Sequence, residues 1–392
     1  MKSNNQNSKN GRWLLKPLAI LYSLYVFSIL GLFASCGRST IAKVSGVSCT
    51  PYLSDSITFS CISRDYSVIY GPNIKTNIYF YKDAAHGRLI CFNGVGRIID
   101  TIPIPDSLLH AKITGFCAIT KDSFAFLQYK KLFLCNIKSK FFKEFNIDRH
   151  GMKCEAISNQ YPLEIYDSLA FYYSFGDTIV LNTPKNWELN VDIAYDETVF
   201  NLNKDKIENI KAGGFPKEIY DDSNCYYSFW PSRCLNYKQH ELVYLYRQSD
   251  VLYVFNYLTK TFRKIPIQNP DFLPNDKFDM NKMGDFNYLS KYETENCRNV
   301  AIVYNKFKNE YYVMFSPKCS YENPNSDEVL KPIDKPWSVL VLDSNFILKK
   351  KINFPAKQYY FAGIPLQRGL LVGYLSNFNA TTNSSKYAIF EF

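Results

Sequence analysis

A two-strand pattern recurs along the chain, and it limits the possible folds more than any other feature of the sequence. Each copy has an apolar, alternating strand, then a polar turn, then a second strand with scattered basic residues. This is the pattern of a β-hairpin. The clear copies span 87–104, 131–147, 250–267 and 337–354, and a weaker fifth copy spans 198–211.

Short apolar strands precede most of these hairpins, at 77–81, 123–127, 242–246 and 310–315. Each unit is therefore predicted to be a four-stranded antiparallel meander, and repeated units of this kind are the sequence sign of a β-propeller. A two-sheet sandwich, the competing all-β fold, does not predict a repeated hairpin. The polar segments 214–236 and 317–335 are expected to be surface insertions, and long amphipathic helices are not evident.

The C-terminal segment predicts how the ring closes. It holds three strands, over 359–364, 369–375 and 386–392. Because a blade needs a fourth strand, we expect the alternating segment 56–62 to supply it and to remove the free edges. The five hairpins and this set predict six blades, with seven as the alternative.

The N-terminus has the pattern of a secretory signal. Basic residues precede an apolar run over 18–33, and that run ends in Ala34, Ser35 and Cys36. This ending resembles the bacterial lipobox, whose cysteine becomes the lipidated first residue of the mature chain. The run is shorter than the roughly 20 residues of a membrane span, which favours cleavage over a permanent transmembrane helix. We predict a lipoprotein signal peptide over 1–35, a lipidated tether over 36–50 and a propeller domain over 51–392.

The residues after Cys36 predict where the lipid holds the protein. Gly37 differs from the aspartate that retains lipoproteins at the inner membrane, so we expect an outer-membrane anchor. The basic segment 37–43 differs from the acidic cluster of many surface lipoproteins, which favours the periplasmic face over the cell surface. A triply acylated cysteine gives stable attachment to a membrane.

Charge and cysteine content limit the partners. Loss of the signal peptide removes four basic residues and no acidic one, so the formal net charge falls from +10 to +6. The lysines are scattered, and we expect a monomer without a nucleic-acid partner. Ten cysteines remain besides Cys36. Cys225 with Cys234, or Cys297 with Cys319, are candidate disulfides, and no C-x-x-C spacing indicates a metal or redox site.

The sequence contains no motif for a catalytic or metal site. It has no G-x-S-x-G elbow, P-loop or H-E-x-x-H motif, and its four histidines lie in separate units. Asp271, Asp276 and Asp279 lie in one loop, but that loop lacks the glycine and the final acid of a calcium loop. We therefore predict no catalytic residue, no metal and no cofactor.

An aromatic segment is the candidate binding loop. Tyr226, Tyr227, Trp230 and Arg233 lie close together in the sequence, between predicted strands. Aromatic faces with a guanidinium could stack on sugar rings or hold a protein partner. The alternative is that these aromatic side chains pack in the core at the start of a blade, beside a Cys225–Cys234 bridge.

Three segments resemble an uncharacterised family of Bacteroidetes lipoproteins thought to be β-propellers. The first runs from Phe215 and Pro216 through YYSFWP at 226–231 into the strand at 242–244 and the hairpin at 250–267. The other two are NEYY at 309–312 and KPWSVLVLD at 335–343. The resemblance implies a propeller fold and carries no catalytic residue to this chain. The anchor, the ring of repeats and the missing catalytic motif together predict an outer-membrane lipoprotein that binds protein or glycan, without catalysis. The alternatives are a carbohydrate-active hydrolase or lyase, and an envelope sensor or assembly factor.

Overall fold

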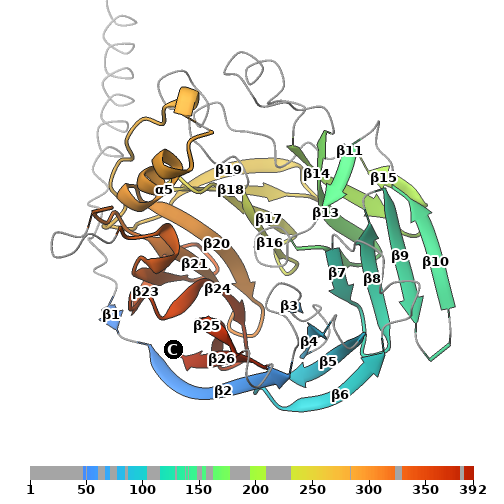
Figure 1. Cartoon of the computed structure of the whole chain (residues 1–392). Coiled ribbons are helices and arrows are strands. Elements are labelled where there is room, and N and C mark those ends of the chain that lie inside the picture. The colour runs from blue at the N-terminus through green and yellow to red at the C-terminus, as the bar shows by residue number, and fades with distance from the viewer. Residues whose placement is uncertain are drawn as a thin grey trace, which may run out of the picture. The chain divides into compact units, whose positions relative to one another are not determined.

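The computed structural model describes most of the propeller domain. The described residues are 47–49, 51–60, 67–70, 77–83, 87–103, 115–128, 130–136, 138–139, 141–147, 152–155, 162–176, 195–208, 231–282, 284–322, 329–379 and 384–392. Six sheets are arranged in a ring, and within each sheet successive strands pair antiparallel (Figure 1). The prediction of an all-β propeller with six blades is confirmed.

The first three blades run in chain order from the inner to the outer strand. Blade 1 comprises β3 (Ser67–Tyr70), β4 (Ile78–Asp83), β5 (Arg88–Asn93) and β6 (Ile98–Pro103). Blade 2 comprises β7 (Gly115–Ala118), β8 (Ser123–Gln128), β9 (Lys131–Asn136) and β10 (Phe141–Asn146). Blade 3 comprises β11 (Met152–Glu155), β12 (Glu164–Tyr166), β13 (Leu169–Gly176), β14 (Tyr195–Asn201) and β15 (Lys206–Glu208).

The other three blades complete the ring. Blade 4 comprises β16 (Ser232–Asn236), β17 (Glu241–Leu245), β18 (Val251–Asn256) and β19 (Thr261–Pro266). Blade 5 comprises β20 (Arg298–Asn305), β21 (Glu310–Ser316), β22 (Trp337–Leu342) and β23 (Leu348–Phe354). Blade 6 comprises β24 (Tyr359–Pro365), β25 (Gly369–Asn379), β26 (Ser384–Glu391) and the N-terminal β2 (Tyr52–Ser60).

The two ends of the propeller domain meet in blade 6, as predicted. Strand β2 pairs antiparallel with β26, from Tyr52 opposite Glu391 to Ser60 opposite Ser384. The N-terminal strand thus covers the open edge of the last sheet, and the ring closes without a free edge there. A further short strand, β1 (Val47–Cys49), pairs parallel with the outer strand β23 of blade 5.

The hairpin turns use one repeated side-chain device. The residue at the end of the strand before the turn, or directly after that strand, is an Asn or Asp whose side chain accepts backbone N–H groups of the turn. Asn256 accepts from Leu258 and Thr259, and Asp343 accepts from Asn345 and Ile347. Because an Asn or Asp side chain can replace a backbone acceptor in this way, it stabilises a tight turn at each of these positions.

The core lies in the layers between neighbouring blades. Val254 of blade 4 and Val313 of blade 5 belong to one buried cluster, and Val339 of blade 5 and Phe390 of blade 6 belong to another. Similar clusters join blades 2 and 3, blades 6 and 1, and blades 1 and 2. Middle strands are packed on both faces, which explains their nearly continuous apolar sequences.

The structure corrects two expectations. The segment 214–236 was predicted to be a surface insertion, but its last five residues form β16, the inner strand of blade 4, and all five are buried. The connection from β19 to β20 holds a short helix, α5 (Phe286–Glu295), which no sequence pattern predicted. Asp285 caps this helix by accepting the backbone N–H groups of Asn287 and Tyr288.

Candidate functional site

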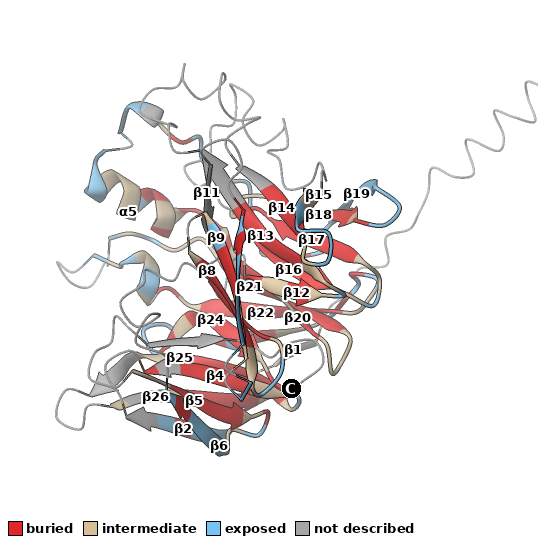
Figure 2. Ribbon diagram, turned by 90° about the vertical axis from the view of Figure 1, so that its right-hand side faces the viewer, coloured by how far each residue is buried: buried red, intermediate tan, exposed pale blue. Residues whose placement is uncertain are grey.

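Alternating strand directions give the ring two different faces. Connections from the outer strand of one blade to the next blade, and those between the second and third strands, emerge at one face, which we call the loop face. The hairpin turns between first and second strands, and between third and fourth strands, emerge at the opposite turn face. The long insertions 267–297 and 317–336 both belong to the loop face. In Figure 2, α5 lies on the left and the turn from β18 to β19 lies on the right.

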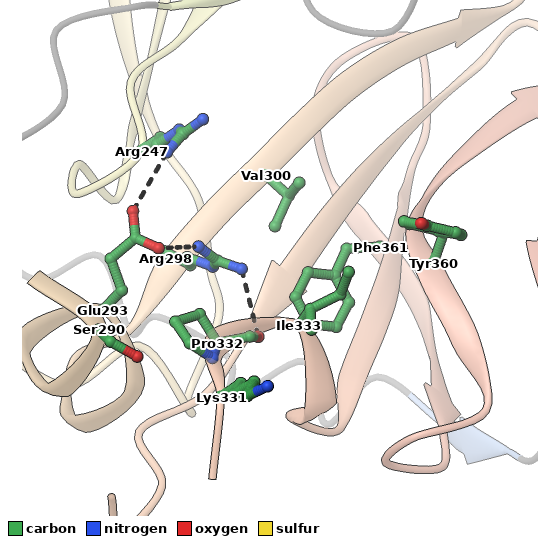
Figure 3. A pocket seen from close by; sticks show the side chains of 10 residues that line it. All are labelled: Arg247, Ser290, Glu293, Arg298, Val300, Lys331, Pro332, Ile333, Tyr360 and Phe361. Carbon is green, nitrogen blue, oxygen red and sulfur yellow. Dashed lines mark hydrogen bonds and ion pairs between the residues drawn. The ribbon is translucent and has the colours of Figure 1, made fainter. Parts of the chain in front are cut away.

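An open cleft of about 620 Å³ lies on the loop face. Its walls come from three blades and both insertions, so residues distant in the sequence meet there (Figure 3). The lining residues are Arg247, Ser290, Glu293, Arg298, Val300, Lys331, Pro332, Ile333, Tyr360 and Phe361. This volume falls in the range of small-ligand sites.

The electrostatic centre of the cleft is one carboxylate held between two arginines. Nη1 of Arg298 lies 2.8 Å from Oε2 of Glu293, and Nη1 of Arg247 lies 3.5 Å from Oε1 of the same carboxylate (Figure 3). The guanidinium of Arg298 also lies 5.1 Å from the ring centre of Phe361. Together with the exposed Lys331, basic groups outnumber the single acid in the lining. The cleft therefore favours an anionic ligand.

A buried lysine supports one wall of the cleft. Lys335 is fully buried, and its Nζ donates to the carbonyl oxygens of Glu293 and Asn296, at 3.1 and 2.8 Å. These carbonyls belong to the C-terminal end of α5, where helix carbonyls lack partners within the helix. Burial, with the nearby Arg298 charge, lowers the pKa of Lys335 to about 7. Lys335 thus fixes the helix that carries Glu293.

The acidic loop over 271–281 supports the same helix. The hydroxyl of Tyr292 donates to the carbonyl oxygen of Asp276, and the side chain of Asn275 bonds the backbone of Cys297 in both directions. The side chain of Asp279 accepts the backbone N–H of Asn281. Across the described part of the chain, no group of three or more His, Cys, Asp or Glu residues could hold a metal ion.

Arg233, predicted to belong to an exposed binding loop, is instead buried between blades 3 and 4. It lies on β16, its side chain is fully buried, and its guanidinium contacts the carboxylate of Glu164. Its Nε lies 3.2 Å from Oε2 of Glu197, which also accepts the hydroxyl of Tyr244 at 3.2 Å. An arginine between two acids inside the ring joins neighbouring blades and is not available to a ligand. The prediction was therefore wrong for this residue.

The other members of the candidate loop remain a prediction. Tyr226, Tyr227, Trp230 and Cys225 lie outside the described residues, so the predicted Cys225–Cys234 bridge does too. Cys234 is buried on β16, and burial raises the pKa of its thiol well above the ordinary value. Cys297 and Cys319 are both free thiols, so the alternative bridge between them is not formed.

The predicted anchor also lies outside the described residues, which begin at Val47. Cys36 and the signal peptide over 1–35 therefore stay predictions. Among the helices that the structure describes, none has the length and apolar character needed to span a bilayer.

Together, fold and site define a six-bladed propeller with a basic, partly aromatic cleft on its loop face. No protein-family model matches the sequence, and no curated protein matches it. Among solved structures, a DUF4221 family member from Bacteroides vulgatus is similar with a TM-score of 0.63 and 18% identity, over 87% of this chain and 97% of that one. This likeness shows a shared fold, in agreement with the predicted resemblance to an uncharacterised Bacteroidetes propeller family.

Two enzymes among the solved structures are more distantly similar. A Xanthomonas campestris gluconolactonase has a TM-score of 0.43 and 8% identity, over 87% of this chain and 95% of that one. A streptogramin B lyase has a TM-score of 0.39 and 12% identity, over 87% of this chain and 98% of that one. At this distance neither likeness bears on the chemistry of the cleft.

Proposed function

We propose that the protein is a lipid-anchored binding propeller whose loop-face cleft holds an acidic oligosaccharide. The observation that carries the proposal is the pair of arginines around Glu293, with Lys331 and the half-buried Tyr360 on the cleft walls. Guanidinium groups suit the planar carboxylate of a uronic acid, and an aromatic ring suits the apolar face of a sugar. A concave site of this size fits a few sugar units better than the broad surface of a folded protein partner.

The contacts of Glu293 explain how the site can select a charged ligand. Its carboxylate offsets part of the charge of Arg247 and Arg298 and holds both side chains in place. About a quarter of the Arg247 side chain is exposed. A ligand carboxylate can therefore bond to Arg247 without breaking the closer contact between Glu293 and Arg298. A neutral sugar would leave these charges without a new partner, so affinity is expected to depend on ligand charge.

The first test compares acidic and neutral oligosaccharides of similar length by titration calorimetry. We expect binding of oligouronates only, weakened by salt because the cleft charges are partly exposed. Replacing Arg247→Gln and Lys331→Gln together should lower affinity by about tenfold or more. The matched control is Lys282→Gln with Lys291→Gln, which removes the same charge from exposed positions outside the cleft. Equal binding of neutral and acidic sugars would refute the proposal.

A hydrolase or lyase acting on carbohydrate is the alternative function. Hydrolysis of a glycoside generally needs two carboxyl groups flanking the scissile bond. Of the side chains that line the described cleft, Glu293 is the single carboxylate, and two arginines hold it. We therefore favour binding over catalysis, and incubation with oligouronates followed by product analysis distinguishes the two. An envelope sensor or assembly factor would instead bind a protein partner and show no affinity for sugars.

The anchor is tested separately from the cleft. Metabolic labelling with a clickable palmitate analogue should label the chain, and Cys36→Ala should abolish both labelling and recovery with the outer-membrane fraction. Protease added to whole cells should leave the chain intact if it faces the periplasm. Loss of the chain under those conditions would assign it to the cell surface.

A further inference from the structure

The turn face carries a ring of exposed apolar side chains. They lie in the turns before the outer strands, or within the first residues of those strands, and all are between 43% and 70% exposed. We call this set the apolar rim. Its members are Tyr52 and Leu53 of blade 6, Val95, Ile98 and Ile99 of blade 1, Phe141 and Phe142 of blade 2, Leu258 and Phe262 of blade 4, and Ile347 of blade 5. Isolated exposed apolar residues are ordinary, but a set repeated at or next to the same hairpin turn on five blades is not.

The outer strands β10 and β19 change from apolar to charged residues with distance from the turn face. Strand β10 begins with Phe141 and Phe142, continues with Lys143 and Glu144, and all four side chains are exposed. Strand β19 likewise places Phe262 next to the turn, before Arg263 and Lys264. Apolar groups at the rim with charged groups behind them match the polarity change across a lipid–water interface.

Basic residues dominate the turns that lie between the members of the rim. The described basic residues of these turns are Arg97, Lys121, Lys138, Lys204, Lys238, Lys260, Lys306, Lys308 and Arg368. The described acidic ones are Asp122, Asp167, Asp205 and Asp343. Asp343 is engaged with the backbone of its own turn. A surface that combines apolar groups with an excess of basic groups is complementary to anionic phospholipid.

The chain enters its first described strand, β1, from the side of the same face. Strand β1 runs parallel to β23, with Val47 opposite Lys350 and Cys49 opposite Ile352. Because β23 starts at the turn face, the chain also enters β1 from the turn-face side. Ten residues, 37–46, separate Val47 from Cys36, and they can span at most about 35 Å. A lipid on Cys36 would therefore lie within about 35 Å of the start of β1.

We propose that the turn face rests on an anionic phospholipid surface, with the apolar rim inserted at the level of the headgroups. The proposal uses the lipid anchor of the proposed function to set the distance, but the contact itself depends on the rim and the basic turns. In this orientation the loop face, with its cleft, points away from the membrane toward soluble or wall-bound ligands.

The test uses the mature chain, residues 36–392, with Cys36→Ser so that no acyl chain contributes. The chain is sedimented with vesicles of phosphatidylethanolamine and phosphatidylglycerol, and with vesicles of phosphatidylcholine. We expect binding to the anionic vesicles, with a weakening of about fivefold for each basic turn residue replaced by Gln. Phe141→Glu with Phe142→Glu should weaken binding by at least about tenfold. The matched control is Phe286→Glu on α5, which removes an 85% exposed phenylalanine from the loop face.

A second measurement keeps the test independent of folding effects in the charged variants. Phe142→Trp and Phe286→Trp keep an aromatic side chain at each position, and quenching by brominated lipid reports depth in the bilayer. We expect quenching at position 142 and none at position 286. Any one of three results would overturn the proposal. They are failure to bind anionic vesicles, equal quenching at both positions, and self-association of the chain through the rim without vesicle binding. Labelling of Cys36 and binding of oligouronates are unaffected by any of these results, so failure here is distinguishable from failure of the proposed function.

Discussion

Replacing Arg233→Met tests whether a buried ion pair holds blades 3 and 4 together. The side chains of Arg233 and Glu197 are both fully buried, with 3.2 Å between the guanidinium Nε and the carboxylate. At an effective dielectric constant of about 20, two unit charges at that separation attract by about 5 kcal/mol before the cost of desolvation. The variant leaves Glu197 and Glu164 without their cation. We therefore expect the free energy of unfolding to fall by about 3–5 kcal/mol.

The loss of unfolding free energy caused by Arg233→Met should depend on pH in a defined direction. Burial already raises the pKa of Glu164, although Arg233 opposes the rise. Without Arg233 the folded-state pKa of Glu164 rises further above its unfolded value. Folding then takes up a proton, so the stability of the variant increases as the pH falls through the raised pKa toward the ordinary range. The difference from the parent chain should be smaller at pH 5 than at pH 7.

Urea denaturation followed by tryptophan fluorescence measures both effects. The control is Arg263→Met on β19, where an arginine that is 52% exposed pairs with Glu241 at 2.7 Å. A pair of this kind contributes less than about 1 kcal/mol. Adding Glu197→Gln to Arg233→Met should restore part of the loss, because it removes one uncompensated charge. If Arg233→Met costs no more than Arg263→Met, or if its deficit is the same at both pH values, the ion pair does not hold the blades together.

Three further predictions address the cleft and the closure of the ring. The pKa of Lys335 is lowered to about 7, so above pH 7 the unfolded chain holds a proton that the folded chain has released. Thermal stability should therefore rise with pH above 7, and Lys335→Met should flatten that rise. Asp285→Ala should destabilise α5 by about 1 kcal/mol, seen as faster amide exchange over 286–295 with the exchange of β22 unchanged as the internal reference. A chain that begins at residue 61 lacks β2 and leaves β26 as an open edge, so it should melt at a lower temperature and aggregate more than the mature chain.

Most strands could be predicted from the sequence because the alternation of apolar and polar residues in a strand is set by its own blade. Outer hairpins alternate and end in Asn or Asp turns, and those local signals located the hairpins of five blades. Strand β16 was missed because its sequence, SRCLN, is polar, and a polar strand is indistinguishable from a loop until its partners are known. Arg233 is satisfied by Glu164 and Glu197, which lie 69 and 36 positions earlier in the chain. No local pattern contains that information.

The cleft could not be predicted for a related reason. Arg247 follows β17, Glu293 lies on α5, and Tyr360 lies on β24, so only closure of the ring brings them together. Helix α5 is short and mostly polar, and its Asp285 cap is a weak signal by itself. The candidate loop was chosen for its density of aromatic residues. Density is a poor guide in a chain in which 17% of residues are aromatic, because many of the aromatic side chains that the structure describes are buried in the core.

The connections at the two faces differ in how freely their lengths can change. The described connections at the turn face include tight hairpin turns held by the side chain of an Asn or Asp, as at Asn256 and Asp343. Short turns of this kind leave the apolar rim exposed, and such a surface is suited to the flat lipid bilayer that we propose as its partner. The loop face carries the insertions 267–297 and 317–336, whose lengths are free to change without disturbing the sheets, and these insertions build the concave cleft. The entry of the chain into β1 from the turn-face side and the cleft on the loop face therefore both depend on the antiparallel order of the strands, which separates the hairpin turns between first and second and between third and fourth strands from the connections that carry the insertions.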